Sequence, residues 1–330
     1  MISPPNLTIY SDILEVSKKS GVPIKKILDV FYYLTSSKPV ENAKLLQMVG
    51  VSKNALNQVK KELSGYLKPS SKETALMAKK IPDVKSLYNK EYMVEEKLLG
   101  AIENANYKKV LAFLENTLLK RPHPKRRYDQ FSATAETTAR RASLLDFFGD
   151  VKGKRLLFLG DDDFTSIATA SLGSAENITV LDIDTSILRE ISNLSQKNKF
   201  RLKVLEYDAR KSLPAGLIGK FDVVFTDPPY TLEGAELFIS RAIELLDHRN
   251  LGARLYLCYG GSDRAKERFL PIYEVLTKSG LFVRWIFDKF NRYSGAESIG
   301  SASSLVICDV TPKTKPLIQG SFDKPIYTNY

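Results

Sequence analysis

The second half of the chain alternates strand-like and helix-like segments, and this alternation constrains the fold more than any other feature. Five apolar segments read as strands separated by helical stretches or short connections: 155–160, 177–182, 201–208, 221–227 and 253–260. Nearly continuous apolar strands joined by crossovers predict a parallel sheet covered by helices on both faces. Two later segments, 281–290 and 303–310, have no helical stretch between them, so we expect an antiparallel pair at the sheet edge.

The first half has helical periodicity and predicts a separate domain. A short helix ends at Gly50, Ser52 is placed to cap the next one, and residues 64–75 are suited to a small hairpin. This order predicts a winged-helix-like domain over residues 1–119, whose last helix covers 93–119. We expect a linker and a leading helix capped by Thr134 over 120–150, a Rossmann-like α/β domain over 151–310, and a tail over 311–330. The tail has no periodicity, so we expect it to be mobile unless a ligand holds it.

Composition narrows the class of protein. The two cysteines and two histidines of the 330 residues exclude a disulfide framework and a cysteine or histidine metal cluster, so we expect no metal. No apolar run approaches the roughly 20 residues that span a bilayer, and the N-terminal segment does not resemble a secretory signal. We therefore expect a cytoplasmic protein that does not enter a membrane.

The net charge of +11 is concentrated in the first half. Residues 1–150 hold 25 Lys and Arg against 16 Asp and Glu, whereas the rest hold 24 against 22. The third predicted helix offers polar and basic side chains to a DNA groove: Lys53, Asn54, Asn57, Lys60 and Lys61. The alternative is a solvated face on a dimerisation module, which we rank slightly above nucleic-acid binding.

Acidic residues follow four successive strands of the predicted sheet. Ligands of such sheets bind outside the carboxyl ends of the strands, so these positions are the candidate site. They are Gly160 with Asp161, Asp162 and Asp163; Asp182 and Asp184; Asp208 with Ala209; and Asp227 with Pro228 and Tyr230.

The second and third groups are placed to hold a nucleoside. Asp182 lies about 20 residues after the first glycine, a spacing that suits hydrogen bonds from both ribose hydroxyls. Asp184 fits a helix cap better, although we keep it among the cofactor contacts. Asp208 is placed to accept from the exocyclic amine of adenine; its alternative role is that of a turn residue.

The sequence Asp227-Pro-Pro-Tyr230 predicts a rigid lip that presents the carboxylate and the aromatic ring to the cleft. The same four letters occur in amino methyltransferases acting on adenine, cytosine, guanine or glutamine, which indicates alkylation of a nitrogen. A rigid turn without a catalytic part is the alternative.

Three adjacent aspartates repel one another unless a cation compensates them. The helix dipole accounts for part of this cluster. The carboxylate of S-adenosylmethionine would be repelled there, whereas its decarboxylated form or a polyamine would be attracted. A divalent metal is a competing explanation.

Taken together, these motifs resemble the branched-chain polyamine synthase family, the aminopropyltransferases of thermophiles. The resemblance is carried by residues 160–168, 227–231, the upstream 127–130 and the "TAETTARRASLL" segment, and it spans nearly the whole chain. It implies transfer of aminopropyl groups from decarboxylated S-adenosylmethionine to the secondary amine of spermidine or a related polyamine, releasing methylthioadenosine. A homodimer is also expected from the family.

The resemblance assigns the catalytic aspartate to Gly160–Asp163, and we favour Asp161 and Asp162 because Asp163 begins the helix. Asp227 would hold or deprotonate the amine, and substrate contacts would come from Tyr128, Gln130, Pro228 and Tyr230. Two rivals remain: an S-adenosylmethionine-dependent amino methyltransferase acting on DNA or RNA, and a transcription regulator that senses a nucleoside.

Overall fold

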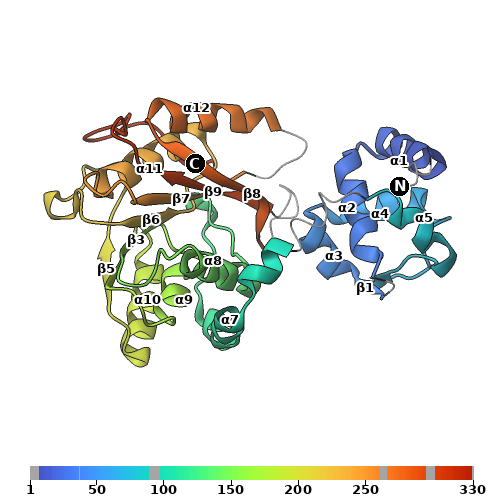
Figure 1. Cartoon of the computed structure of the whole chain (residues 1–330), viewed down its shortest axis with the longest axis horizontal. Helices are drawn as coiled ribbons and strands as arrows, with labels where there is room; N and C mark the ends of the chain where they lie inside the picture. The colour runs from blue at the N-terminus through green and yellow to red at the C-terminus, as the bar shows by residue number, and fades with distance from the viewer. Residues whose placement is uncertain (1–6, 37, 89–96, 261–265, 295–301, 329–330) are drawn as a thin grey trace. The chain divides into compact units, whose positions relative to one another are not determined.

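The computed structural model describes residues 7–36, 38–88, 97–260, 266–294 and 302–328. The chain divides into two compact units, each described separately below (Figure 1). The helical unit comprises Met1–Ala101 with Ser262–Ala265 and Arg292–Ala302. The sheet unit comprises Ile102–Gly261, Lys266–Asn291 and Ser303–Tyr330.

The helical unit contains the helix-turn-helix and hairpin expected from the sequence. Gly50 ends one helix in the left-handed conformation, at φ 67°, and the Ser52 hydroxyl accepts from the Ala55 N–H to begin the next. The hairpin is closed by an antiparallel bridge between Leu67 and Leu76. The elements of this unit are α1 (Leu7–Ser20), α2 (Ile24–Leu34), β1 (Val40–Glu41), α3 (Asn42–Val49), α4 (Lys53–Glu62), β2 (Glu73–Thr74), η1 (Ala78–Lys80) and α5 (Ile81–Lys85).

The boundary between the units lies at residue 101, whereas we expected it after residue 119. The helix predicted over 93–119 is interrupted, and its first residues lie outside the described ranges. Asn104 begins a new helix, α7 (Ala105–Thr117), by accepting from the backbone N–H groups of Asn106 and Tyr107. Buried side chains of α7 pack against α8 (Ala135–Phe147), which places this helix in the sheet unit.

A seven-stranded mixed sheet forms the centre of the sheet unit, in the order β5-β4-β3-β6-β7-β9-β8. Strands β3 to β7 are parallel and β9 runs antiparallel to β7, which confirms the predicted fold class. The two segments expected to pair at the edge, β8 and β9, are neighbours there. The strands are β3 (Arg155–Leu159), β4 (Asn177–Asp182), β5 (Leu202–Glu206), β6 (Val223–Thr226), β7 (Arg254–Tyr259), β8 (Phe282–Arg292) and β9 (Ala302–Asp309).

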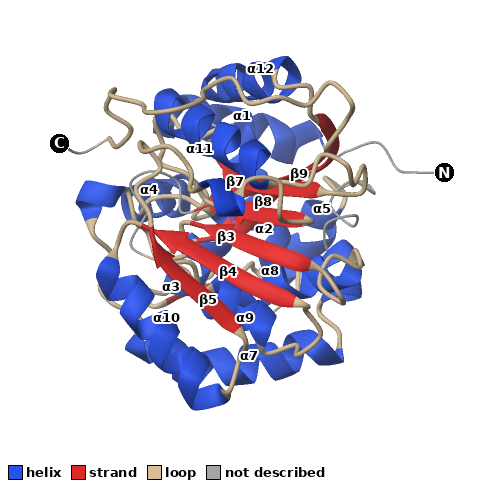
Figure 2. Ribbon diagram, turned by 90° about the vertical axis from the view of Figure 1, so that its left-hand side faces the viewer, coloured by secondary structure: helices blue, strands red, loops and turns tan. Residues whose placement is uncertain are grey.

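Helices cover both faces of this sheet (Figure 2). The remaining elements of the unit are η2 (Leu118–Lys120), η3 (Arg126–Tyr128), α9 (Thr165–Ala170), α10 (Thr185–Asn198), η4 (Ala215–Leu217), α11 (Leu232–Leu245), η5 (Lys266–Phe269) and α12 (Leu270–Lys278). Alternation along β3 sends Leu157 and Leu159 into the core shared with α11 and α12. Phe158 contacts Phe225 of β6, with ring centroids 5.8 Å apart. Every one of these four side chains is buried, so the sheet is a rigid support for the loops at its carboxyl edge.

Candidate active site

The parallel register brings the predicted acidic residues to one edge of the sheet. Leu159 at the end of β3 pairs with Leu181 of β4 and with Thr226 of β6. The residues that follow these strands therefore start from neighbouring positions. These are Gly160 to Asp163, Asp182 and Asp227.

The turn after β3 uses two left-handed residues. Gly160 has φ +73°, where a side chain would be strained, and Phe164 has φ 59° immediately before α9. Between them, the Asp161 carboxylate accepts from the Ser166 N–H at 3.2 Å and is 3% exposed. Burial raises the pKa of Asp161 to about 8. Asp161 thus stabilises the start of α9.

Asp182 lies beside this turn and is held by backbone groups. Its two oxygens accept from the N–H groups of Asp161 at 2.9 Å and Asp184 at 2.7 Å. Burial raises the pKa of Asp182 to about 6, against the effect of these backbone hydrogen bonds. Each carboxylate oxygen has a second lone pair, so Asp182 keeps the capacity to accept from a pair of hydroxyls.

Arg141 of α8 joins the first and fourth strand ends. Its guanidinium is buried, and it donates from Nη1 to Asp163 Oδ2 and from Nη2 to Asp227 Oδ2, each at 2.8 Å. Asp163 also accepts from the Ala133 N–H at 2.6 Å and contacts Arg121 at 3.4 Å. Asp163 therefore has several internal partners, and its predicted contact with the cofactor stays a prediction.

We assigned no role to Arg141 from the sequence. The available signal is its position in α8, because an arginine three and four residues from apolar Leu144 and Leu145 lies on a buried face. A buried charge requires a partner, and this requirement points to the acidic strand ends.

Asp162 differs from its two neighbours. It is half-buried, and within the described part of the chain no hydrogen bond or ion pair reaches its carboxylate. Burial raises its pKa well above the usual range, and the nearby charges of Asp163 and Asp227 add to this effect. Of the three adjacent aspartates, Asp162 is the one with oxygens available to a ligand.

The Asp227–Tyr230 segment forms the expected lip. Pro228 is buried, while Tyr230 is half-buried and its ring lies edge-on to Phe131, at 5.7 Å between centroids. The Tyr230 carbonyl accepts from the Tyr259 hydroxyl at 2.9 Å. Burial is the largest cause that raises the pKa of Tyr230, and the negative charge of Asp227 raises it further. The phenol therefore stays neutral next to these acids.

Asp184 and Gln130 fasten the linker to α10. Asp184 caps α10 through the Ser186 N–H at 2.9 Å and forms an ion pair with Lys125 at 2.5 Å. Gln130 donates to Asp184 at 3.3 Å and accepts from the Lys125 N–H at 2.8 Å. Since the Asp184 side chain is 1% exposed, direct contact with a cofactor would require this junction to open. Both residues therefore have internal contacts in this structure, and their predicted contacts with cofactor and substrate stay predictions.

The third strand end carries a half-buried Asp208 that forms an ion pair with Arg210 at 2.7 Å. The neighbouring Ala209 is buried, and its carbonyl accepts from Arg241 Nε at 2.9 Å. This geometry fits the turn role that we left open for Asp208. The partly exposed carboxylate also remains within reach of a ligand at this edge.

The tail after Val310, which has no periodicity in the sequence, contributes to the core of the sheet unit. Ile326 is fully buried within the core that includes α11, and its carbonyl accepts from the Thr231 hydroxyl at 2.6 Å. The Thr328 N–H donates to Asp129 at 2.9 Å, and Asp129 also receives the Tyr230 N–H at 3.4 Å. The tail has no regular secondary structure, and contacts with distant segments of the chain hold it instead.

Tyr128 lies next to the same tail, with its ring 5.6 Å from that of Tyr327. Both rings are half-buried. The tail therefore brings a second aromatic ring next to Tyr128, a predicted substrate contact, although the tail has no periodic pattern.

Within the described ranges, no group of three or more His, Cys, Asp or Glu side chains is arranged to hold a metal ion. Among the helices described there, none is long and apolar enough to cross a bilayer.

Residues 109–321 match the family model of the branched-chain polyamine synthase A C-terminal domain. The chain belongs to the branched-chain polyamine synthase A family.

Curated relatives of this family member include proteins of archaea. An uncharacterized protein of Methanocaldococcus jannaschii is 41% identical over 200 residues, covering 61% of this chain and 49% of that protein. The N(4)-bis(aminopropyl)spermidine synthase of Thermococcus kodakarensis is 33% identical over 175 residues, covering 52% and 49%. The match thus spans about half the length of these relatives.

Solved structures support the fold of this polyamine synthase family member. The branched-chain polyamine synthase of Thermus thermophilus, in complex with N4-aminopropylspermidine and 5′-methylthioadenosine, has a TM-score of 0.64 at 19% identity over 96% of each chain. A putative RNA methyltransferase of Pyrococcus horikoshii has a TM-score of 0.50 at 17% identity, covering 63% of this chain and 100% of that one. These likenesses confirm a methyltransferase-like α/β sheet.

Proposed function

We propose that the protein transfers aminopropyl groups from decarboxylated S-adenosylmethionine to the secondary amine of spermidine or a related linear polyamine. The observation that carries the proposal is the half-buried Asp162 carboxylate, which has a raised pKa and no partner in the described chain. A polycation supplies the compensating charge that this acidic edge lacks.

The charge balance of the site supports a cationic ligand. Asp163, Asp184, Asp208 and Asp227 each form an ion pair with a basic side chain. No ion pair reaches Asp161, Asp162 or Asp182 from the residues described. A bound cation would favour the ionised forms of Asp162 and Asp182, so the site prefers the ammonium of the decarboxylated cofactor over the carboxylate of S-adenosylmethionine. This preference is one of charge and does not require a specific contact.

We assign the nucleoside of the cofactor to the second and third strand ends. Asp182 would accept from the ribose hydroxyls with its remaining lone pairs, and Asp208 would accept from the adenine amine. Gly160 provides the left-handed turn that starts this part of the site.

The reaction requires a neutral amine. A secondary ammonium has no lone pair, so its proton must leave before attack, and we assign this proton to Asp162. The nitrogen lone pair then forms a bond to the aminopropyl carbon attached to sulfur. The carbon–sulfur bond breaks, its electrons go to the sulfonium, and neutral methylthioadenosine leaves. A raised pKa makes Asp162 a more competent base, because its conjugate acid is weaker.

Asp227 would orient the amine, with its own position fixed by the 2.8 Å contact from Arg141. Tyr230 and Tyr128 are suited to cover the alkyl chain or to lie against an ammonium. Pro228 limits the movement of the lip that carries Asp227. Asp161, Asp163, Asp184 and Gln130 would act as positioning residues, through the contacts described above.

The test is incubation of the full chain with spermidine and decarboxylated S-adenosylmethionine, followed by mass measurement of the product. The expected product gains one aminopropyl group in place of a hydrogen at each transfer. Asp162→Asn keeps the shape of the side chain and removes its basicity, so kcat should fall by about 10²–10⁴. The matched control is Asp161→Asn, which keeps the hydrogen-bond acceptor for Ser166 and should retain most of the activity.

An amino methyltransferase acting on DNA or RNA is the alternative. It would bind the carboxylated cofactor more tightly in isothermal titration and would add methyl groups to a nucleic acid. That result, or equal activity of Asp162→Asn and the unaltered chain, would refute the proposed reaction.

A further inference from the structure

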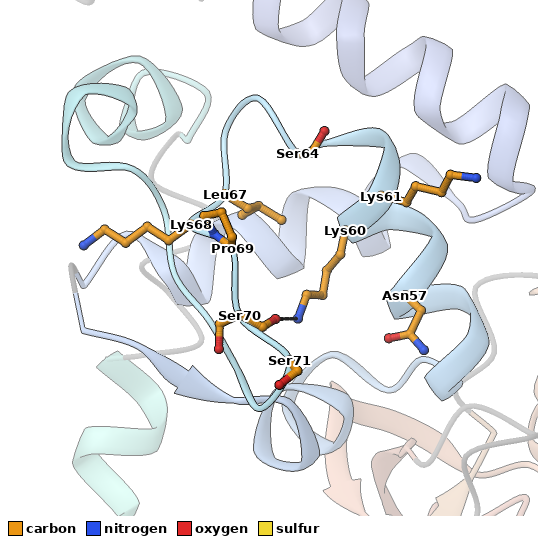
Figure 3. Close-up of a pocket in the computed structure, with 9 residues that line it drawn as sticks. All are labelled: Asn57, Lys60, Lys61, Ser64, Leu67, Lys68, Pro69, Ser70 and Ser71. Carbon is orange, nitrogen blue, oxygen red and sulfur yellow. Dashed lines mark hydrogen bonds between the residues drawn. The ribbon is translucent and has the colours of Figure 1, made fainter.

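The helical unit carries a hollow between α4 and the hairpin 64–77, here called the basic hollow. Its volume is about 460 Å³ (Figure 3). Three of its nine lining residues are lysines, and none of the nine is acidic: Asn57, Lys60, Lys61, Ser64, Leu67, Lys68, Pro69, Ser70 and Ser71. The proposed aminopropyl transfer does not use this surface.

Lys60 and Asn42 hold the two walls of the basic hollow together. Lys60 Nζ donates to Asn42 Oδ1 at 3.1 Å and to the carbonyls of Ser70 and Glu73, each at 3.3 Å. Asn42 donates in turn to the Ser71 carbonyl at 2.8 Å. Burial lowers the pKa of Lys60. The hairpin is therefore fixed against α4 before any partner arrives, which reduces the entropy cost of binding.

Four other lysines on α4 and the hairpin are exposed: Lys53, Lys61, Lys68 and Lys72. Over the described ranges, none of them forms an ion pair. In Figure 3, Lys61 and Lys68 extend away from the basic hollow on opposite sides. This arrangement presents a broad cationic surface with the amide side chain of Asn57 between the lysines.

The composition of this surface argues against a packing role, which we ranked slightly higher from the sequence. Of the large hydrophobic side chains that are exposed among the described residues, only Tyr10 belongs to the helical unit. A surface of unpaired lysines without apolar anchors gains little free energy by packing against another protein surface, because the lysine charges would be buried without partners.

We propose that α4 and the hairpin bind the phosphate backbone of double-stranded DNA. A helix of ten residues beginning at Lys53 fits the major groove of B-form DNA, and the hairpin lysines would reach the adjacent phosphates. The deep, narrow major groove of A-form RNA does not admit a helix. Since phosphate contacts carry no sequence information, we expect binding that is independent of sequence.

Fluorescence anisotropy of the full chain with a labelled DNA duplex tests this inference. With four phosphate contacts, the logarithm of the binding constant should fall against the logarithm of salt concentration with a slope of about −3.6. Lys61→Ala with Lys68→Ala should reduce the slope by about 2 and the affinity at 0.1 M salt on the order of fifty-fold.

The matched control removes two exposed lysines of the sheet unit, Lys197→Ala with Lys203→Ala, and should leave binding near that of the unaltered chain. Aminopropyl transfer should be unchanged in both double variants, so this test is separate from that of the proposed function. Equal losses in the two double variants, tighter binding to an RNA duplex, or no binding to DNA at low salt would overturn the inference.

Discussion

Replacing Arg141 with methionine should destabilise the sheet unit strongly. The guanidinium makes two hydrogen bonds of 2.8 Å to the carboxylates of Asp163 and Asp227, and it is buried. Hydrogen bonds to charged groups contribute about 1.5–3 kcal/mol each, so two give about 3–6 kcal/mol. Breaking buried ion pairs costs about 3–5 kcal/mol, because the remaining charge stays uncompensated. We therefore expect the free energy of unfolding to fall by about 4 kcal/mol.

Urea unfolding followed by circular dichroism measures this loss. With a denaturant dependence of about 3 kcal/mol per molar, the midpoint should fall by roughly 1.3 M. Adding Asp163→Asn to Arg141→Met removes one uncompensated charge. The double variant should therefore be more stable than the sum of the two single losses predicts, by about 1–3 kcal/mol.

A loss of less than about 1 kcal/mol for Arg141→Met would contradict this prediction, because it would mean that Asp163 and Asp227 need no cation. Strictly additive losses of stability for the two substitutions would also contradict the prediction, because residues in contact should show a coupling energy.

Two further predictions concern stability. Ile326→Ala should lower the free energy of unfolding by about 2–4 kcal/mol in the same urea assay, because Ile326 is fully buried; an unchanged midpoint would place the tail outside the core. Between pH 5 and pH 8, Asp161 with its pKa of about 8 holds a proton that the unfolded chain, with a value near 3.8, has released. Raising the pH through this window therefore destabilises the folded chain, and Asp161→Asn should gain a few kcal/mol over the unaltered protein by pH 8; a difference independent of pH would contradict the raised pKa.

The strand plan and the carboxyl-edge site were predictable because both depend on local patterns. Apolar runs such as 155–160 mark buried parallel strands, and topology then brings the residues after Leu159, Leu181 and Thr226 together. The cap of the leading helix at Thr134 was predictable for the same reason, since its hydroxyl needs only the Thr137 N–H, three residues ahead.

The missed features depend on partners far apart in the sequence. Nothing in the local pattern indicates that Arg141 bridges Asp163 and Asp227, which lie 22 and 86 residues away. The contribution of the tail to the core was missed, because its apolar residues are separated by prolines and follow no period. Ile326 is nevertheless fully buried. Asp184 and Gln130 were assigned to ligands because their residue types suit both ligand contacts and internal fastening.

The contact between Thr328 and Asp129 spans 199 residues of chain. A ribosome adds about 5–20 residues per second, so Thr328 is synthesised roughly 10–40 s after Asp129. During this interval, the Asp227–Tyr230 lip is synthesised without the carbonyl of Ile326 beside Thr231. The nascent protein thus completes this lip only once residue 328 has been added, after all seven strands of the sheet have been synthesised.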